Sequence, residues 1–165
     1  MITLAGAAAA GKSTTCRLLG NCVEVEPLEC HRLPWLERQL CFLWRFTEAV
    51  LSNWGRDVVL SNSLYTVAAY SACVPGIDAS ARRVLVEVAE RLAAMLEPRA
   101  VALIAPPRTL MKRSRRRGAR VEDVEFNPRV IRCVNDFLQA RLPTVVTTKP
   151  PRHVAEEVRA ILEHD

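Results

Sequence analysis

The chain has 165 residues, 50% of them hydrophobic and 25% charged, with a formal net charge of +5. This length favours a single domain, residues 1–165, and the composition excludes fibrous, low-complexity and disordered classes of protein. No apolar run reaches the roughly 18 to 20 residues that span a bilayer, so we expect a cytoplasmic protein that does not bind membranes.

Short apolar runs alternate with segments of helical periodicity along the whole chain. Five runs predict β-strands, at residues 1–5, 22–25, 57–60, 100–104 and 144–147. Alternation of this kind is typical of a sheet with parallel strands and helices on its faces. The fold class we predict is therefore α/β, with a five-stranded, mostly parallel sheet flanked by helices.

The intervening segments have apolar residues at helical spacing, which predicts buried helix faces. A helix over 34–52 would bury Leu36, Leu40, Leu43 and Val50. The helix after Ser80 would bury its own apolar stripe, which consists of Val84, Val88, Leu92 and Met95. Two later helices have matching stripes, Val130, Ile131, Val134, Phe137 and Leu138 in one and Val154, Val158, Ile161 and Leu162 in the other.

A phosphate-binding pattern, G-x-x-x-x-G-K-[ST], follows the first strand and consists of Gly6, Ala7, Ala8, Ala9, Ala10, Gly11, Lys12, Ser13 and Thr14. In this setting, successive backbone N–H groups and a helix N-terminus cradle the phosphates. Lys12 would reach the β- and γ-phosphates, and the Ser13 hydroxyl would bind Mg²⁺. The pattern predicts a nucleoside triphosphate and Mg²⁺ as cofactors. ATP is favoured over GTP because the segment after the last strand, Thr147 to Pro150, is not the guanine-reading Asn-Lys-x-Asp.

A second candidate group is Glu26, which follows the second strand and therefore lies at the edge where ligands of parallel sheets bind. A carboxylate there can accept the proton of an acceptor hydroxyl as that hydroxyl attacks the γ-phosphorus. The alternative interpretation is a solvated acid at a strand end.

With the phosphate loop, Glu26-Pro27 and the segment from Gln39 to Phe46 in view, the chain resembles the deoxynucleoside kinases and their thymidylate kinase relatives. The resemblance covers most of the chain and implies a P-loop nucleoside or nucleotide kinase-like fold. It implies that Glu26 is the general base and that Gln39 binds the nucleobase. For Gln39, a surface amide is the alternative.

The family's usual tryptophan after Glu-Pro is displaced here, since its place falls near His31 and the nearest tryptophan is Trp35. Trp35 would stack on a base, or else belong to the core. Arg45, six residues after Gln39, is the best candidate to reach a charged acceptor.

After the fourth strand, the segment 112–124 resembles the arginine-rich lid of these kinases. Seven basic residues and no acid lie between Arg108 and Arg120, and 20 of the chain's 23 basic residues are arginine. Arg113, Arg117 and Arg120 fit the lid pattern and would neutralise charge on the transferred group. A nucleic-acid surface is the less favoured alternative.

One departure from the family lies after the third strand, where an acid and an arginine usually stand and this chain has Ser61 and Asn62. We therefore predict an ATP-dependent nucleoside or nucleotide kinase whose acceptor is a deoxynucleoside or a nucleoside monophosphate. The alternative is a nucleotide-binding module with weak or lost transfer activity. A basic nucleic-acid-binding ATPase is a third, weaker interpretation.

The six cysteines, at 16, 22, 30, 41, 73 and 133, lack the paired C-x-x-C spacing of zinc and redox sites. We expect buried thiols, with disulfides as the alternative. The expected partner is a small-molecule nucleoside or nucleotide, and a homodimer is left open.

Overall fold

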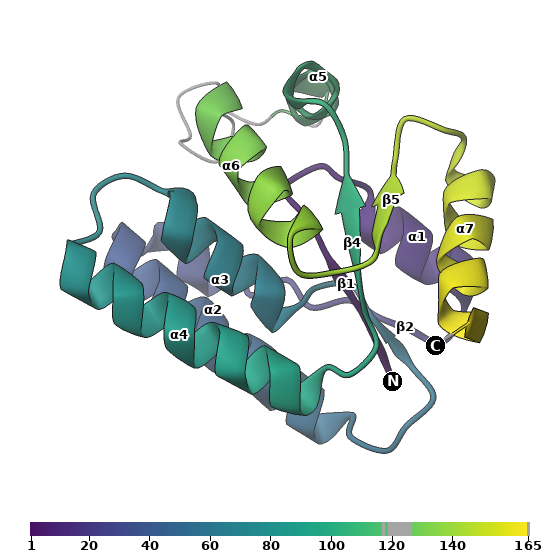
Figure 1. Ribbon diagram of the computed structural model, residues 1–165, viewed down its shortest axis with the longest axis horizontal. Helices are drawn as coiled ribbons and strands as arrows, with labels where there is room; N and C mark the ends of the chain where they lie inside the picture. The colour runs from purple at the N-terminus through teal and green to yellow at the C-terminus, as the bar shows by residue number, and fades with distance from the viewer. Residues whose placement is uncertain (117, 119–126, 165) are drawn as a thin grey trace.

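The computed structural model describes residues 1–116, 118 and 127–164, and its centre is a five-stranded sheet (Figure 1). The strand order is β2-β3-β1-β4-β5, and every pair is parallel. The strands are β1 (Ile2–Ala5), β2 (Cys22–Val23), β3 (Val59–Leu60), β4 (Ala100–Ile104) and β5 (Thr144–Val146). The predicted α/β class and its five strands are confirmed.

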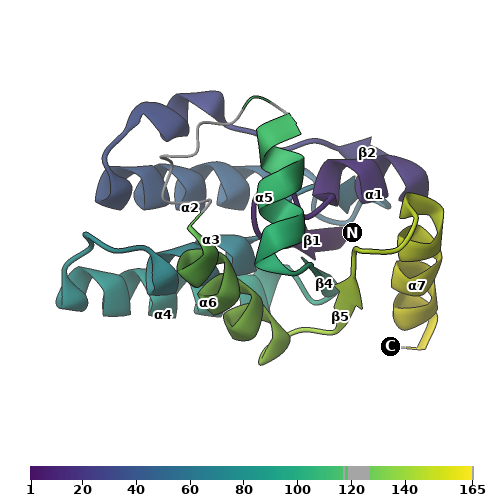
Figure 2. The same cartoon turned by 90° about the horizontal axis from the view of Figure 1, so that it is seen from above.

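Helices cover both faces of this sheet. They are α1 (Lys12–Leu19), α2 (Trp35–Ser52), α3 (Leu64–Cys73), α4 (Ala79–Leu96), α5 (Pro107–Arg116), α6 (Pro128–Gln139) and α7 (Pro151–His164), with a 3₁₀ helix η1 (Leu28–Arg32). Helices α1 and α7 pack together on one face, α3 and α6 lie on the other, and α2 and α4 pack against α3. Seen from above, α5 crosses the sheet at the carboxyl ends of its central strands (Figure 2). Nowhere in the described chain does a helix combine the length and hydropathy needed to cross a membrane.

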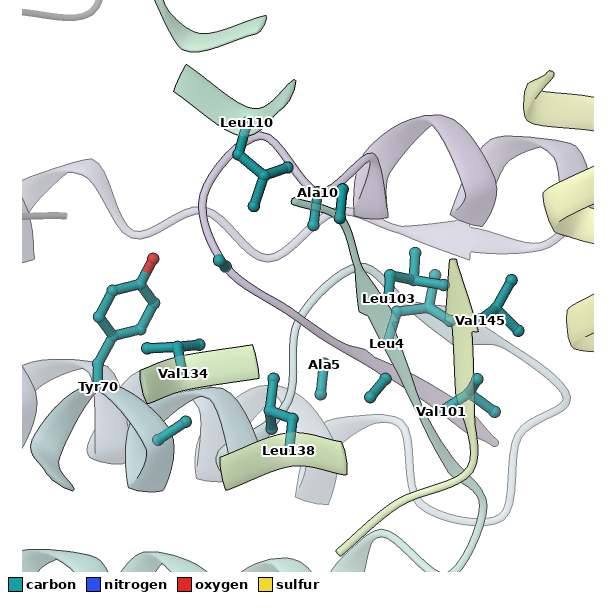
Figure 3. Close-up of a cluster of buried hydrophobic side chains, with 14 of the residues drawn as sticks. Leu4, Ala5, Ala10, Tyr70, Val101, Leu103, Leu110, Val134, Leu138 and Val145 are labelled. Atoms are coloured by element: carbon teal, nitrogen blue, oxygen red, sulfur yellow. The ribbon is translucent and has the colours of Figure 1, made fainter. Parts of the chain in front are cut away.

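The main core lies between the sheet and α3, α6 and α7. Leu4, Val101 and Leu103 on the central strands are fully or almost fully buried. Val134 and Leu138 of α6 belong to the same cluster and lie on the side of the strands where Ala5 points (Figure 3). Central strands of a parallel sheet are covered on both faces, which is why β4 is apolar at all five positions. The predicted buried faces of α6 and α7 are confirmed.

The predicted buried face of α4 was wrong. Val84 and Met95 are 57% and 71% exposed, and the buried positions are instead Leu85, Ala89 and Ala93. Small alanines on that side let α4 approach α3 closely, so the face with less apolar volume is the one that packs. In α2 the same inversion leaves Leu36 and Leu40 exposed, although Val50 is buried as predicted.

A buried carboxylate ties the start of α3 to the end of α4. Glu97 accepts hydrogen bonds from the Ser63 hydroxyl at 2.5 Å and from the Leu64 N–H at 2.9 Å. Ser63 is itself the N-cap of α3, because its oxygen accepts from the Tyr65 N–H. Burial raises the pKa of Glu97 from 4.5 to about 7, against the lowering effect of these two hydrogen bonds.

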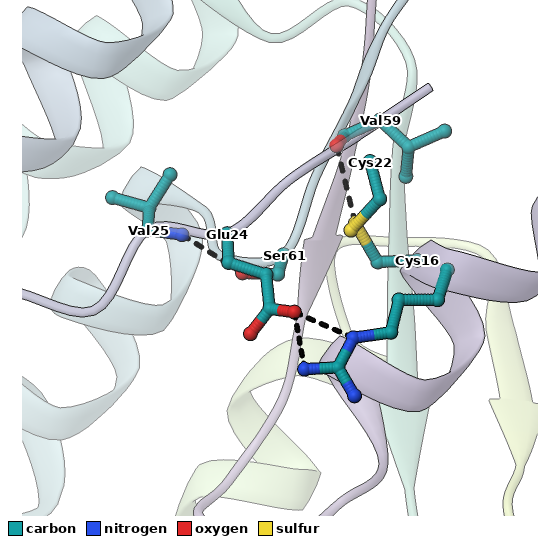
Figure 4. A network of polar contacts seen from close by, with 7 residues as sticks. Cys16, Cys22, Glu24, Val25, Val59 and Ser61 are labelled. Atoms are coloured by element: carbon teal, nitrogen blue, oxygen red, sulfur yellow. Dashed lines mark hydrogen bonds and ion pairs between the residues drawn. A yellow bond between two sulfur atoms is a disulfide. The ribbon is translucent and has the colours of Figure 1, made fainter. Parts of the chain in front are cut away.

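The cysteines form three disulfides, so the expectation of buried thiols was wrong. Cys16–Cys22 joins α1 to β2, Cys30–Cys41 joins η1 to α2, and Cys73–Cys133 joins α3 to α6. Figure 4 shows the Cys16–Cys22 bond next to Val59. No sequence pattern marks which cysteines pair. The packing of the helices and strands brings the two members of each pair together.

Candidate active site

The phosphate loop turns sharply between β1 and α1. Gly6 and Gly11 adopt positive φ angles of 155° and 98°, and Ala9 does so at 60°. A Cβ on Gly6 would lie 2.5 Å from the Leu103 carbonyl oxygen, so this position needs glycine for close approach to β4. Gly11 precedes α1 and offers no side chain to cap its first N–H groups. Uncapped N–H groups at a helix start are suited to an anion.

The Lys12 side chain folds across the loop that precedes it. Its ammonium donates to the Gly6 carbonyl at 2.9 Å and to the Ala7 carbonyl at 3.0 Å. The Lys12 ammonium is thus held over the loop. A phosphate bound there would replace the two carbonyls as the hydrogen-bond acceptor of this ammonium.

Helix α3 braces the same loop with two side chains that sequence reasoning missed. The Thr66 hydroxyl accepts from the Gly6 N–H at 3.2 Å, and the Tyr70 hydroxyl accepts from the Ala8 N–H at 2.9 Å. Thr66 and Tyr70 are four residues apart and therefore share one helix face. That spacing after the third strand was the available signal, but nothing in it identifies the loop as the partner.

Two cavities meet at the phosphate loop and share Ala9 and Gly11. The first cavity, of about 300 Å³, extends from Lys12 and Ser13 to Glu26, Gln39 and the ends of β2 and β3. The second, of about 270 Å³, lies between Thr14, Thr15, Arg113, Arg116 and the segment after β5. An elongated ligand in one cavity would therefore present its end to the other across the loop.

The first cavity has aromatic and amide walls. Gln39 lines it and is buried, with the Ser71 hydroxyl 3.5 Å from its Oε1. Phe42 stacks on Phe46 at 5.6 Å between ring centroids and meets His31 edge to face at 5.1 Å. Disulfide Cys30–Cys41 closes this wall, because it binds the segment that carries His31 to the helix that carries Gln39.

The carboxyl ends of β2 and β3 form the floor of the first cavity. Ser61 accepts a hydrogen bond from the Val25 N–H at 3.0 Å (Figure 4), and the Asn62 amide lies 3.5 Å from the Val25 carbonyl. Glu26 follows directly and lines the cavity. Among the described residues around this cavity there is no arginine, and the one ammonium is that of Lys12.

Two predicted acceptor residues lie away from this cavity. Arg45 forms ion pairs with Glu29 at 2.8 Å and Glu48 at 2.9 Å on the outer surface of α2. These carboxylates raise the pKa of Arg45, first through the hydrogen bond with Glu48 and then through Glu29. Trp35 lies beneath the Arg38 guanidinium, 4.4 Å from it, and packs at the margin of the main core.

The lid arginines divide between described and undescribed parts of the chain. Arg113 lines the second cavity and donates to the hydroxyl of Thr147 at 3.1 Å and also to its carbonyl. Arg116 lines the same cavity. Arg117 and Arg120 lie outside the described residues.

Comparison with solved structures shows the same architecture over the whole chain. Deoxyadenosine kinase from M. mycoides with bound dATP has a TM-score of 0.71 at 14% identity, covering 98% of both chains. The same enzyme with the product dCMP and a flexible dCDP has a TM-score of 0.69 at 14% identity, covering 99% of both. The YorR protein from Bacillus subtilis, in complex with phosphorylated GDP, has a TM-score of 0.58 at 16% identity and covers 98% of this chain and 95% of that one.

The fold is therefore that of the P-loop nucleoside kinases. No family model matches the sequence, and neither does any curated protein.

Proposed function

We propose that the chain transfers the γ-phosphoryl group of ATP to the hydroxyl of an uncharged nucleoside, with deoxynucleosides as the first candidates. The observation that carries this proposal is the meeting of two cavities on one phosphate loop. One cavity suits a nucleotide, and the other suits an acceptor whose hydroxyl would face the terminal phosphate. The kinase fold supports the same reaction class.

The second cavity and the loop would hold the donor. N–H groups at the start of α1 would bind the phosphates, and Arg113 and Arg116 would cover the nucleotide. Within the described chain, no cluster of three acidic, histidine or cysteine side chains could hold a metal ion. The Ser13 hydroxyl, which lines the first cavity with Lys12, would hold Mg²⁺ together with phosphate oxygens and water, and the ion would neutralise phosphate charge.

Glu26 would act as the general base in the first cavity. The acceptor hydroxyl oxygen forms a bond to the γ-phosphorus while the bond from that phosphorus to the β,γ-bridging oxygen breaks. The hydroxyl proton passes to Glu26, and ADP leaves with the bridging oxygen. Lys12 would stabilise the charge on the transferred group.

The acceptor would be uncharged because the described residues that line the first cavity include no arginine and no lysine besides Lys12 to bind a second phosphate. Its walls supply Gln39, Asn62 and stacked phenylalanines, which suit a planar, hydrogen-bonding base. Arg45, which might have served a monophosphate, is paired with Glu29 and Glu48 outside the cavity. Nucleoside monophosphates are thus the less favoured acceptors.

The second candidate function is nucleotide binding with weak or lost transfer. Its support is the pair Ser61 and Asn62, which place no acid and no cation at the end of β3. Such a module would bind ATP as a signal and leave the acceptor cavity unused.

An assay of phosphate transfer separates the two functions. The protein is incubated with ATP labelled at the γ position, Mg²⁺ and a panel of nucleosides and nucleoside monophosphates. We expect label in deoxynucleosides more than in monophosphates. ATP binding by calorimetry without label in any acceptor would favour the binding module instead.

A further inference from the structure

Helix α5 lies over the phosphate loop, and Leu110 packs it against that loop. Leu110 is fully buried and belongs to the same core cluster as Ala7 and Ala10 of the loop. Figure 3 shows Leu110 beside Ala10, above the turn between β1 and α1. The face of α5 that presents Leu110 is therefore the face turned toward the loop.

Ser114 lies one turn beyond Leu110 on this face, since residues four apart in a helix are neighbours. It is 3% exposed and lines the first cavity together with Lys12, Ser13 and Glu26. Its flanking residue Arg113 lines the second cavity instead. Helix α5 thus gives a hydroxyl to one cavity and guanidinium groups to the other.

The Ser114 hydroxyl has no hydrogen-bond partner among the described residues. A buried helical serine ordinarily satisfies its hydroxyl by donating to the carbonyl four residues earlier, and Ser114 does not. A buried hydroxyl without a hydrogen bond lowers the stability of the folded chain. Because the Ser114 hydroxyl lies at a cavity wall, we expect its hydrogen-bond partner to be a ligand in that cavity.

We propose that Ser114 binds the γ-phosphoryl group of the donor, with its hydroxyl donating to a nonbridging oxygen. This inference rests on the proposed function, because it takes the ligand at the loop to be ATP. The γ-phosphate is the fitting group since Ser114 shares its cavity with Lys12 and Ser13, whereas the rest of the nucleotide would lie in the second cavity. A hydrogen bond to a charged phosphate oxygen is stronger than one between neutral groups.

The test compares nucleotides with and without a γ-phosphate in the Ser114→Ala variant. Dissociation constants are measured by calorimetry, with Mg²⁺, for ADP and for the ATP analogue that carries a β,γ-imido bridge. We expect affinity for the ATP analogue to fall about tenfold and affinity for ADP to stay within about twofold. The unliganded variant should unfold at the parent's temperature or above it, because a buried unsatisfied hydroxyl has been removed.

Thr3→Val is the control, because Thr3 is also a buried hydroxyl residue but lies outside both cavities, on the side of Glu97. It should leave both affinities unchanged. Equal loss of both nucleotides in Ser114→Ala, no loss of either, or a lower unfolding temperature would overturn the role of Ser114. A parent that binds neither nucleotide would refute the proposed function as well, whereas the first three results leave that function standing.

Discussion

The two sides of the proposed active site differ in how they are formed: the donor side from the backbone of one segment, and the acceptor side from side chains of several elements. The proposed donor side is one continuous segment, Gly6 to Thr14, whose backbone N–H groups and single lysine would bind the phosphates. The acceptor side gathers single side chains from β2, η1, α2, β3 and α3. A backbone site tolerates little change at its glycines, whereas a side-chain site can change its substrate one residue at a time. Compared with the pattern of the deoxynucleoside kinases, the sequence has the phosphate loop and departs from the acceptor side at Ser61 and Asn62.

The largest effect should come from the donor side, in Lys12→Ala. Removing the ammonium takes away charge stabilisation of the transferred group, and we expect phosphoryl transfer to fall by about 10² to 10³. Single-turnover transfer from γ-labelled ATP measures it, with circular dichroism to check folding. The fold should survive because the hydrogen bonds from Lys12 to the Gly6 and Ala7 carbonyls lie within one loop and do not join separate elements of the core. Transfer at the parent rate would remove Lys12 from the mechanism.

Glu26→Gln tests the carboxylate at the sheet edge, the one acid among the described residues that line the first cavity. We expect the turnover rate to fall by about 10² or more, because the amide cannot take the acceptor proton. Affinity for ATP should stay within about twofold. Glu24→Gln is the control, since Glu24 pairs with Arg17 on the surface and is two residues away. A Glu26 variant as active as the Glu24 variant would show that another group accepts the proton.

Asn62→Arg sharpens the contrast by giving the acceptor cavity a cation. We expect the KM for a nucleoside monophosphate to fall about tenfold, because a guanidinium can form charge-assisted hydrogen bonds to the phosphate. The KM for the unphosphorylated nucleoside should change little. Gln139→Arg, on an exposed position of α6, adds the same charge away from the cavity. An equal effect of both variants would mean that net charge, not position, governs the acceptor.

Arg45→Ala should have the smallest effect. Its guanidinium pairs with exposed Glu29 and Glu48, and such surface pairs contribute little. Steady-state kinetics should show kcat and KM within about twofold of the parent. Gln39→Leu provides the contrast, because Gln39 lies buried in the cavity wall and its loss should raise the nucleoside KM. A large change of kcat or KM in Arg45→Ala, with no change in Gln39→Leu, would mean that the acceptor binds at Arg45 and not in the first cavity.

The parts that sequence predicts well are those set by local physics. The loop from Gly6 to Thr14 needs glycines at fixed places, and a buried strand such as β4 needs a continuous apolar run. Glu26 was placed at the edge by topology alone, and the structure does bring it to the same cavity as Lys12.

The parts that sequence missed depend on packing between distant elements. Helix α4 has two faces with apolar residues. The face with Ala89 and Ala93 is the buried one, because its small side chains let α4 pack against α3. In the sequence, Tyr70 is one residue of an apolar helix and has no recognisable role. Only the fold shows that its hydroxyl accepts a hydrogen bond from the Ala8 N–H. Arg45 and Gln39 lie on the same helix, six residues apart, and therefore on different faces of it. Gln39 lines the first cavity, whereas Arg45 faces away from that cavity.

The buried carboxylate of Glu97 makes folding a proton-binding reaction. Its folded pKa of about 7 lies above the ordinary 4.5, so the folded chain holds a proton that the unfolded chain releases between these values. The stability that this proton contributes is complete below about pH 4.5 and is lost as the pH rises through about 7. Urea unfolding of the parent relative to Glu97→Gln should show the difference shrink toward acid pH and grow toward neutral pH. A constant difference across that range would mean that Glu97 is charged in the folded chain throughout. Glu97 also accepts from the Leu64 N–H at the start of α3, the helix whose Thr66 and Tyr70 accept hydrogen bonds from the phosphate loop, so its titration acts on the support of that loop and on no residue of the loop itself.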